Sequence, residues 1–351
     1  MFRKKKDEQN EQKRILVTGA TGFLGKYVVQ ELLENGYHVI ACGRNKERLL
    51  ALEEMAKNDR GMDAGNLEVY QWDLSEIQEK KMKVDCVIHA AALSTVWGKW
   101  KDFYDTNVIG TWNVVLFCRR NKVKRLVYVS SPSIYTQKKD RFDIEEDSYH
   151  RNNKLNYYIR TKLLAEKLVG RAAHKGIETV IIRPRGLFGI GDTSIIPRLI
   201  NANRGIGIPL FRKGKNVVDI TCVENVALAL RLAAESEKAV GKTYNISNGE
   251  PREFKEILEE LFEQLGEEPH YRKLPFGLMY RVAGLLELSY KIRRKYEEPV
   301  ITKYTMLTLG YSQTLNIEKA KADLGYEPKI TLSEGIKKYA LDCKAKEVSE
   351  A

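Results

Sequence analysis

Residues 15–25 read Ile-Leu-Val-Thr-Gly-Ala-Thr-Gly-Phe-Leu-Gly. The first three form an apolar run that predicts a buried strand, and apolar residues in 27–33 recur at helical spacing. Between them, Gly19 allows a tight turn, Gly22 lets a pyrophosphate approach the backbone, and Gly25 lets helix and strand pack closely. A strand, a glycine turn and a helix in this order predict a dinucleotide site at the helix N-terminus.

The rest of the first half repeats this alternation of strand and helix. It predicts an α/β fold of Rossmann type with a doubly wound parallel sheet, followed by a smaller, mostly helical C-terminal substrate domain. The expected strands are 38–42, 67–72, 86–90, 125–130 and 179–183, and the expected helices are 47–57, 103–121 and 156–175. The domains expected are a polar tail at 1–12, a dinucleotide-binding Rossmann domain at 13–186 and a substrate-binding part at 187–351, within which 219–247 returns to the Rossmann core.

Composition narrows the class of protein. The chain has 351 residues with 43% hydrophobic content, and no apolar run approaches the roughly 20 residues that span a bilayer. Five scattered cysteines without a CxxC pair indicate reduced thiols in a cytoplasmic protein, and neither the cysteines nor the histidines have the spacing of a metal site. The net charge of +12 is spread along the chain without a nucleic-acid motif. We therefore expect surface lysines and an anionic cofactor, with neither metal nor nucleic acid as a partner.

The end of the second expected strand selects the cofactor. An acidic residue there would hold the ribose 2′-hydroxyl of NAD, whereas arginine accommodates the 2′-phosphate of NADP. The sequence has Gly43-Arg44-Asn45 and no carboxylate, which favours NADP(H) over NAD(H). Asp73 and Leu74, after the third strand, are placed to receive the adenine ring, although a helix cap is an equally good role for Asp73.

A tyrosine and a lysine supply the expected acid–base chemistry. Tyr158 and Lys162 are four residues apart in a helical pattern and share one face, unlike Tyr157, which has Thr161 at that spacing. A nearby ammonium favours the phenolate and lowers the tyrosine pKa, so the phenol can exchange a proton with a carbonyl or alcohol while hydride moves at the nicotinamide. Ser130, Ser131 and Ser133 follow a strand at the edge where ligands bind, and the three compete to hold the substrate oxygen.

With these residues in view, 13–335 resembles an extended short-chain dehydrogenase/reductase. The resemblance rests on the glycine motif preceded by Thr18, on Tyr158-x-x-x-Lys162, and on the segments 73–74, 89–91, 107–111 and 183–184. It implies that Ser131 is the catalytic serine, with Ser133 as the second choice. It also implies a set of cofactor-binding residues: Gly19, Thr21, Gly22, Phe23, Leu24, Gly25, Arg44, Asp73, Leu74, Ala90, Ala91, Ala92, Asn107, Tyr158, Lys162 and Arg183. A homodimer is common in this superfamily.

Within the superfamily, the chain is most similar to the 3β-hydroxysteroid dehydrogenase/isomerase branch, which includes bacterial 2-alkyl-3-oxoalkanoate reductases. The similar segments are 91–98, 131–135, 183–189 and 223–227. This resemblance implies an NAD(P)-dependent oxidoreductase acting on a 3-oxo or 3-hydroxy group of an apolar 3-oxoalkanoate or sterol-like substrate. A non-catalytic dinucleotide sensor is a third class, against which the joint presence of Ser131, Tyr158 and Lys162 argues.

The rival branch contains nucleotide-sugar epimerases with tightly bound NAD. Such enzymes commonly use an arginine to grip the diphosphate, and Val218 stands in the matching place. A valine cannot pair with a diphosphate, which lowers this alternative, but Arg212 or Lys215 from the preceding loop could substitute.

Two sets of apolar residues are candidates for the region that binds the substrate. Trp97, Trp100 and Phe103 could form an apolar wall, although aromatic clusters are more often plain packing. Residues 276–290 form an apolar stripe followed by a basic run at 291–295. We favour a cavity or core role for this stripe, with a dimer contact or peripheral membrane association as the alternatives.

Overall fold

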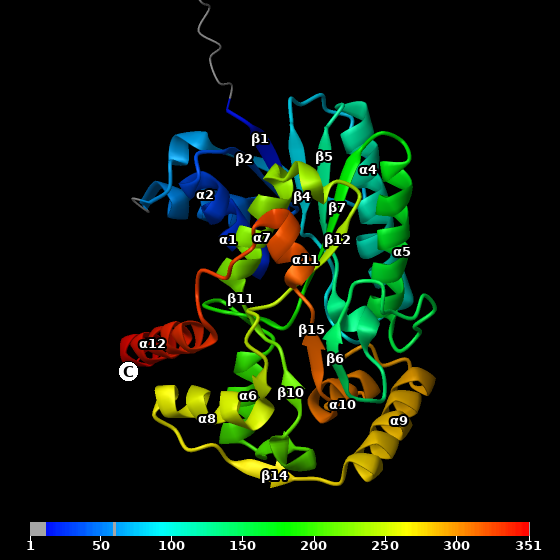
Figure 1. The fold of residues 1–351 in the computed structure, drawn as a ribbon, viewed down its shortest axis with the longest axis vertical. Coiled ribbons are helices and arrows are strands. Elements are labelled where there is room, and N and C mark those ends of the chain that lie inside the picture. The colour runs from blue at the N-terminus through cyan, green and yellow to red at the C-terminus, as the bar shows by residue number, and fades with distance from the viewer. Residues whose placement is uncertain (1–11, 59–60, 351) are drawn as a thin grey trace, which may run out of the picture.

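The structure is a computed structural model that describes residues 12–58 and 61–350. The polar tail expected at 1–12 therefore lies outside the described residues, apart from its last residue. A parallel sheet occupies one end of the molecule and the C-terminal elements occupy the other, beyond the carboxyl ends of its strands (Figure 1).

The main sheet has seven parallel strands in the described part of the chain. In spatial order they are β12 (Thr243–Ile246), β7 (Glu178–Pro184), β5 (Arg125–Val129), β4 (Cys86–His89), β1 (Arg14–Thr18), β2 (His38–Gly43) and β3 (Leu67–Gln71). The chain runs outward from β1 in both directions, so the strand order reverses between β1 and β4. Ligands bind at such a switch point in doubly wound sheets. The predicted Rossmann-type fold is confirmed.

Helices cover both faces of this sheet (Figure 1). Apolar residues on the two faces of the strands form two separate cores because neighbouring strand residues point to opposite sides. One core is shared with α1 (Phe23–Glu34), α2 (Lys46–Asn58), α7 (Val223–Glu235) and α11 (Glu318–Leu324). The other is shared with α4 (Gly110–Arg120) and α5 (Tyr157–Ala173).

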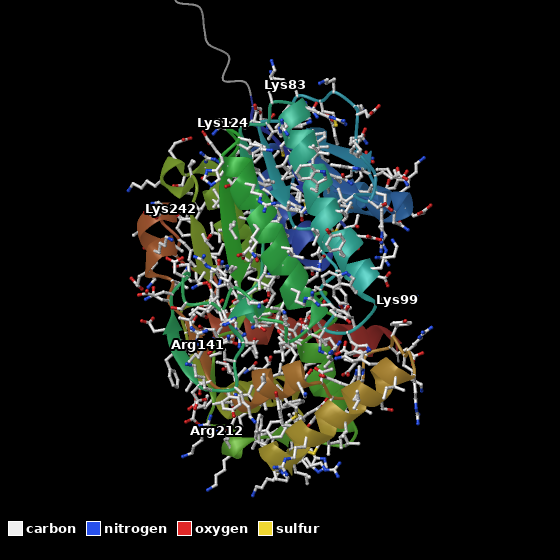
Figure 2. All side chains as sticks on the ribbon, turned by 90° about the vertical axis from the view of Figure 1, so that its right-hand side faces the viewer. Lys83, Lys99, Lys124, Arg141, Arg212 and Lys242 are labelled. Carbon is white, nitrogen blue, oxygen red and sulfur yellow. The ribbon has the colours of Figure 1, made fainter. Side chains whose placement is uncertain are left out.

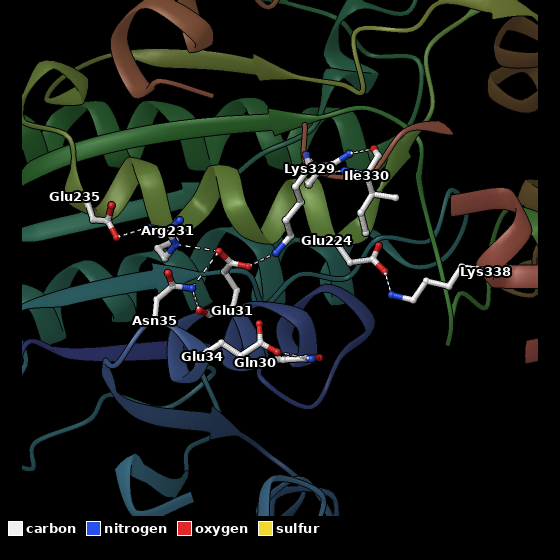
Figure 3. Close-up of polar contacts among 11 residues, drawn as sticks. Gln30, Glu31, Glu34, Asn35, Glu224, Arg231, Glu235, Lys329, Ile330 and Lys338 are labelled. Atoms are coloured by element: carbon white, nitrogen blue, oxygen red, sulfur yellow. Dashed lines mark hydrogen bonds and ion pairs between the residues drawn. The ribbon is translucent and has the colours of Figure 1, made fainter. Parts of the chain in front are cut away.

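A buried carboxylate joins three distant segments on the first face. Glu31 of α1 is 4% exposed and accepts a hydrogen bond from the Arg231 Nε at 2.9 Å. Its other oxygen pairs with Lys329, which precedes the last helix (Figure 3). This cluster ties residues near the C-terminal end to the cofactor-side helix α1, and the two cations offset the cost of burying the charge.

The C-terminal part carries smaller sheets and further helices. One sheet has the order β13 (Arg252–Glu253), β10 (Val217–Val218), β15 (Gln313–Leu315) and β6 (Arg141–Ile144). Two separate two-stranded sheets are also present: β8 (Leu187–Phe188) pairs with β11 (Thr221–Cys222), and β9 (Ile208–Leu210) pairs with β14 (Tyr271–Lys273). The helices are α6 (Ile196–Arg204), α8 (Phe254–Leu265), α9 (Phe276–Ile292), α10 (Lys303–Gly310) and α12 (Leu332–Glu350). In the described residues, no helix combines the length and apolarity that a bilayer crossing requires.

The helix expected at 103–121 is interrupted. The structure has α3 (Trp100–Tyr104), a π-helical turn at Asp105–Ile109 and then α4. Apolar periodicity alone does not show this turn, which contains the buried Asn107 with its hydrogen bonds to Leu93 and Thr161. Single π-helical turns occur frequently at functional sites, and this one lies beside α5.

Candidate active site

The glycine loop has the shape that a dinucleotide needs. Gly19 has φ +71°, and a Cβ there would lie 2.8 Å from the Ala91 backbone. A Cβ on Gly25 would lie 2.0 Å from the Gly19 oxygen, so helix α1 can approach the turn only with glycine at this position. Gly22 is exposed and caps α1 without a side-chain hydrogen bond. The first amides of α1 therefore remain available for phosphate oxygens.

The predicted residues around this loop share one edge of the sheet. Thr21, Phe23 and Leu24 are half-buried. Ala90, Ala91 and Ala92 follow β4 directly across the switch point and are half-buried as well. Leu74 packs next to Gly110, while Asp73 is exposed and accepts a hydrogen bond from the Ser75 amide at 2.9 Å. That bond lowers the pKa of Asp73 and is the local turn contact that the sequence offered as its alternative role.

A buried histidine links the strands on the two sides of the switch point to a helix. His89 Nδ1 lies 2.7 Å from Thr18 Oγ1, and His89 Nε2 lies 3.0 Å from Thr111 Oγ1. Burial lowers the pKa of His89 to about 3, so the imidazole is neutral. The hydrogen bonds therefore join the last residues of β1 and β4 to α4 without any charge.

Arg44 lies exposed at the end of β2. It is beside the glycine loop, because a Cβ on the neighbouring Gly43 would lie 3.3 Å from Thr21 Oγ1. The Arg44 guanidinium also lowers the pKa of Asp73 electrostatically. Arg44 therefore lies at the strand end where the sequence predicts a partner for the 2′-phosphate of NADP.

Helix α5 brings Tyr158 and Lys162 to the same edge. Asn156 starts the helix by accepting a hydrogen bond from the Ile159 amide at 2.8 Å. Lys162 is 2% exposed, and its ammonium donates to the carbonyl of Val129, at the end of β5, at 2.8 Å. Lys162 Nζ lies 5.9 Å from the centre of the Tyr158 ring.

The pKa shifts at this pair differ from the sequence expectation. Burial raises the pKa of Tyr158 to about 12, and hydrogen bonding with Ser131 opposes that shift. Burial also lowers the pKa of Lys162 to about 7, while Glu166 raises it. We predicted that Lys162 would lower the tyrosine pKa. For these residues by themselves the net shift is upward instead, because desolvation is its largest cause.

The three candidate serines have different environments. Ser131 Oγ donates to Ser133 Oγ at 3.0 Å and accepts from the Ser133 amide at 3.2 Å. Ser133 also shares a 2.7 Å hydrogen bond with the Tyr304 hydroxyl, whereas the buried hydroxyl of Ser130 has no partner among the described residues. Of the three, only Ser131 interacts with Tyr158 through a pKa-lowering hydrogen bond. Tyr304, on α10, is a site residue that sequence reasoning missed, because it is 171 positions away from Ser133.

Two predicted cofactor residues are occupied by protein contacts. Asn107 bonds the Leu93 amide at 2.7 Å, the Leu93 carbonyl at 3.0 Å and the Thr161 hydroxyl at 3.1 Å. Arg183 is 2% exposed and forms two hydrogen bonds with Glu166, one with Tyr135 and one with the Glu146 carbonyl. Both side chains therefore hold neighbouring segments of the fold together, and their contact with a cofactor stays a prediction.

A cavity of about 570 Å³ opens at the start of α5, next to the candidate residue Tyr158. Trp97 and Trp100 contribute to its wall, whereas Phe103 is fully buried behind it. Tyr157, Glu287 and Tyr304 also line it, so it runs from the start of α5 to α9 and α10. Figure 2 labels Lys99, another lining residue, between the sheet layer and the C-terminal elements. A cavity of this size suits a small organic molecule.

Helix α9 meets the favoured expectation of a cavity or core role on one side only. Ala283 is buried in a small core cluster, against which Phe276, Met279 and Tyr280 pack partly buried. The helix also contributes Glu287, Tyr290 and Lys291 to the cavity. Five other apolar residues of the helix are exposed: Leu278, Val282, Leu285, Leu288 and Ile292.

The switch-point glycine loop, the Ser131–Tyr158–Lys162 group and the adjoining cavity together define a nicotinamide-dependent oxidoreductase of the extended short-chain dehydrogenase/reductase type. Residues 15–247 match the model of the NAD dependent epimerase/dehydratase family, and the chain belongs to this family.

Relatives of known name agree with this class. A 2-alkyl-3-oxoalkanoate reductase of Stenotrophomonas maltophilia is 32% identical over 93% of this chain and 98% of its own. A decarboxylating sterol-4-alpha-carboxylate 3-dehydrogenase of Mus musculus is 31% identical over 94% and 90%. A Bacillus cereus UDP-glucuronic acid 4-epimerase, solved with UDP-glucuronic acid and NAD, shares the fold with a TM-score of 0.72 at 22% identity, over 95% of this chain and 99% of that one.

Proposed function

We propose that this protein is an NADP(H)-dependent oxidoreductase that moves a hydride between the nicotinamide and C3 of a 3-oxo or 3-hydroxy compound with an apolar body. The observation that carries the proposal is the meeting of Ser131, Tyr158 and Lys162 beside a tryptophan-walled cavity. The names of both relatives above agree with this chemistry, since each describes a reaction at a 3-position. Two observations disfavour the epimerase alternative: Val218 cannot pair with a diphosphate, and Arg212 is already paired with Asp140, which leaves the exposed Lys215 as the other predicted substitute.

The residues divide the reaction as follows. A bound nicotinamide cofactor would supply or accept the hydride, and its oxidised ring would carry a positive charge. Ser131 and Tyr158 hold the substrate oxygen, and Tyr158 gives its proton to that oxygen in reduction or accepts it in oxidation. The Val129 carbonyl fixes Lys162 with its nitrogen 5.9 Å from the centre of the Tyr158 ring. Lys162 is buried and Tyr158 is half-buried, so little water reaches the lysine while the phenol can still meet the substrate.

A substrate panel tests this proposal. NADPH and NADH consumption would be followed with a 2-alkyl-3-oxoalkanoate, a 3-oxosteroid and UDP-glucose. We expect NADPH-dependent reduction of one of the 3-oxo compounds. Tightly held NAD together with conversion of UDP-glucose, without net consumption of either reduced cofactor, would contradict the proposal and favour the epimerase.

Arg44 should set the choice between the two cofactors. We expect Arg44→Ala to lower kcat/KM for NADPH by about 10-fold to 100-fold, the range of a lost charged hydrogen bond. The value for NADH should stay unchanged, because NADH has no 2′-phosphate. Arg119→Ala, at the end of α4, is a matched loss of positive charge that should change neither value. Equal losses for both cofactors in Arg44→Ala would show that Arg44 does not read the phosphate.

We also propose that α9 contacts an anionic membrane surface. Its exposed apolar residues lie three or four positions apart on one side, and the exposed Lys291, Arg293, Arg294 and Lys295 follow. The protein should float with anionic vesicles at low salt, and Leu285→Asp/Ile292→Asp should abolish flotation while Leu50→Asp on α2 does not. Absence of binding at low salt would contradict the proposal, and loss of a homodimer in the double variant would identify a second copy as the occupant instead.

A further inference from the structure

A chain of three hydroxyl groups leads from the cavity wall to the candidate catalytic serine. The Tyr304 hydroxyl lies 2.7 Å from Ser133 Oγ, which in turn lies 3.0 Å from Ser131 Oγ. Both distances are those of O–H···O hydrogen bonds. Ser131 and Ser133 are 8% and 6% exposed, whereas Tyr304 is half-buried and lines the cavity. The chain therefore connects α10, in the C-terminal part, with the segment that follows β5.

Helix α10, which lies beside α9 (Figure 1), holds Tyr304 in place. Thr302 caps the helix by accepting a hydrogen bond from the Thr305 amide at 3.1 Å. Glu287 of α9 accepts a hydrogen bond from the first amide of α10 at 2.7 Å. The Tyr304 ring packs against a buried apolar cluster that includes Ile159 of α5. These contacts fix the ring without using its hydroxyl group.

Ser131 has one proton and two possible uses for it. Its hydroxyl donates to Ser133 Oγ and accepts from the Ser133 amide at 3.2 Å. A hydroxyl group offers one donor and two acceptor positions. To hold a substrate carbonyl, Ser131 must donate to the carbonyl oxygen, and it then has no proton left for Ser133. The hydrogen bond between the two serines survives this change only if Ser133 becomes the donor.

Tyr304 can supply the hydrogen bond that Ser133 needs in that arrangement. When Ser133 donates to Ser131, the Ser133 oxygen can accept from the Tyr304 hydroxyl at 2.7 Å. A phenol releases its proton more readily than an aliphatic hydroxyl group and is therefore the stronger donor of the two. Hydrogen bonds in a chain also polarise one another, so a donor at one end strengthens the bonds that follow. The favoured direction of the chain is thus from Tyr304 toward Ser131.

We propose that Tyr304 is a positioning residue of the reaction: it donates to Ser133, which donates to Ser131, so that the Ser131 proton is directed at the substrate oxygen. This inference rests on the proposed function. Proton exchange with the substrate remains the role of Tyr158. The hydrogen bond from Ser131 strengthens as negative charge develops on the substrate oxygen during reduction, so the effect of Tyr304 should fall on kcat and not on KM.

A double-mutant cycle tests this proposal. The wild type, Tyr304→Phe, Ser131→Ala and the double variant would be compared in kcat and KM, with NADPH and the 3-oxo compound that the wild type reduces fastest. Tyr304→Phe removes only the hydroxyl group at the end of the chain. Tyr311→Phe is the matched control, because Tyr311 directly follows α10 and is not one of the cavity-lining residues. NADPH titration of each variant checks that the cofactor site is intact.

We expect Tyr304→Phe to lower kcat by about 10-fold at unchanged KM, the upper end of what one neutral hydrogen bond contributes. Ser131→Ala should lower kcat by about 100-fold, as for a lost donor to the reacting oxygen. The double variant should be no slower than Ser131→Ala, because no hydroxyl group remains for the chain to direct. Tyr311→Phe should keep the wild-type kcat and KM.

Three results would overturn the inference while leaving the proposed function in place. The first is an equal loss from Tyr304→Phe with and without Ser131, which would show that the effect does not pass through Ser131. The second is a raised KM at unchanged kcat, which would make Tyr304 a direct contact of the substrate. The third is full activity of Tyr304→Phe. If the wild type reduces no 3-oxo compound of the panel, the proposed function itself fails, and this inference fails with it.

Discussion

Replacing Tyr158 by phenylalanine should lower kcat by about 1000-fold in both directions, within the 10²–10⁴ range of general acid–base catalysis. The substitution removes one hydroxyl from a half-buried position on α5 and leaves the ring packing. Because Ser131 and the cofactor loop remain, cofactor binding should be unchanged. Steady-state rates with NADPH and the best substrate of the panel provide the measurement, and cofactor titration provides the check on binding.

Because the pKa of Tyr158 is shifted upward, the pH dependence of the rates gives a second readout in the same experiment. Burial raises this pKa to about 12, so the phenol is protonated at neutral pH. Reduction uses the protonated phenol, and therefore its rate should not fall through loss of this proton up to about pH 10. Oxidation uses the deprotonated phenol, so its rate should rise as the pH increases toward the pKa. Tyr158→Phe should lose this rise together with the activity.

A matched control separates this effect from the loss of any buried hydroxyl. The buried Tyr271 hydroxyl on β14 has no hydrogen-bond partner within residues 12–58 and 61–350, and Tyr271 is not one of the cavity-lining residues. Tyr271→Phe should keep full activity. If Tyr158→Phe kept more than about one tenth of the wild-type rate, Tyr158 would not be the proton donor.

The sequence could predict the elements whose signals are local. The glycines at 19, 22 and 25 need no distant information, since a strand, a turn and a helix fix their roles. The pairing of Tyr158 with Lys162 follows from helical geometry alone. Their position at the edge of the sheet follows from the parallel topology, because the carboxyl ends of parallel strands meet at one edge.

The parts that sequence reasoning missed depend on long-range contacts. The resemblance placed Arg183 at the cofactor, which stays a prediction, but its ion pair with Glu166 could not be predicted because it is formed only when α5 packs on β7. Tyr304 reaches Ser133 from the other end of the chain. The pKa of Tyr158 was expected to fall, and it rises because burial is a property of the folded molecule. Sequence spacing reports which groups share a helix face, but not how much water surrounds them.

Glu166→Gln should be the most destabilising single change that we predict outside the reacting groups. Glu166 is 7% exposed and makes two charged hydrogen bonds to Arg183, at 2.8 and 2.7 Å. Breaking a buried ion pair leaves an uncompensated charge and typically costs 3–5 kcal/mol. The free energy of unfolding, measured by urea denaturation, should fall by about 3 kcal/mol or more. Glu166 also raises the pKa of Lys162, so Glu166→Gln should lower that pKa further. If the activity depends on the protonation of Lys162, that part of the pH profile should move to lower pH.

The exposed pair of Lys255 and Glu259 on α8 provides the comparison for this last prediction. Their side chains are 41% and 49% exposed and lie 2.7 Å apart at helical spacing. Glu259→Gln should cost less than about 0.5 kcal/mol, because water solvates both charges well and screens their attraction. Equal stability of Glu166→Gln and Glu259→Gln would show that the buried pair contributes no more than a surface one. A difference of several kcal/mol would instead show that the pair holds α5, and with it Tyr158 and Lys162, against the end of β7.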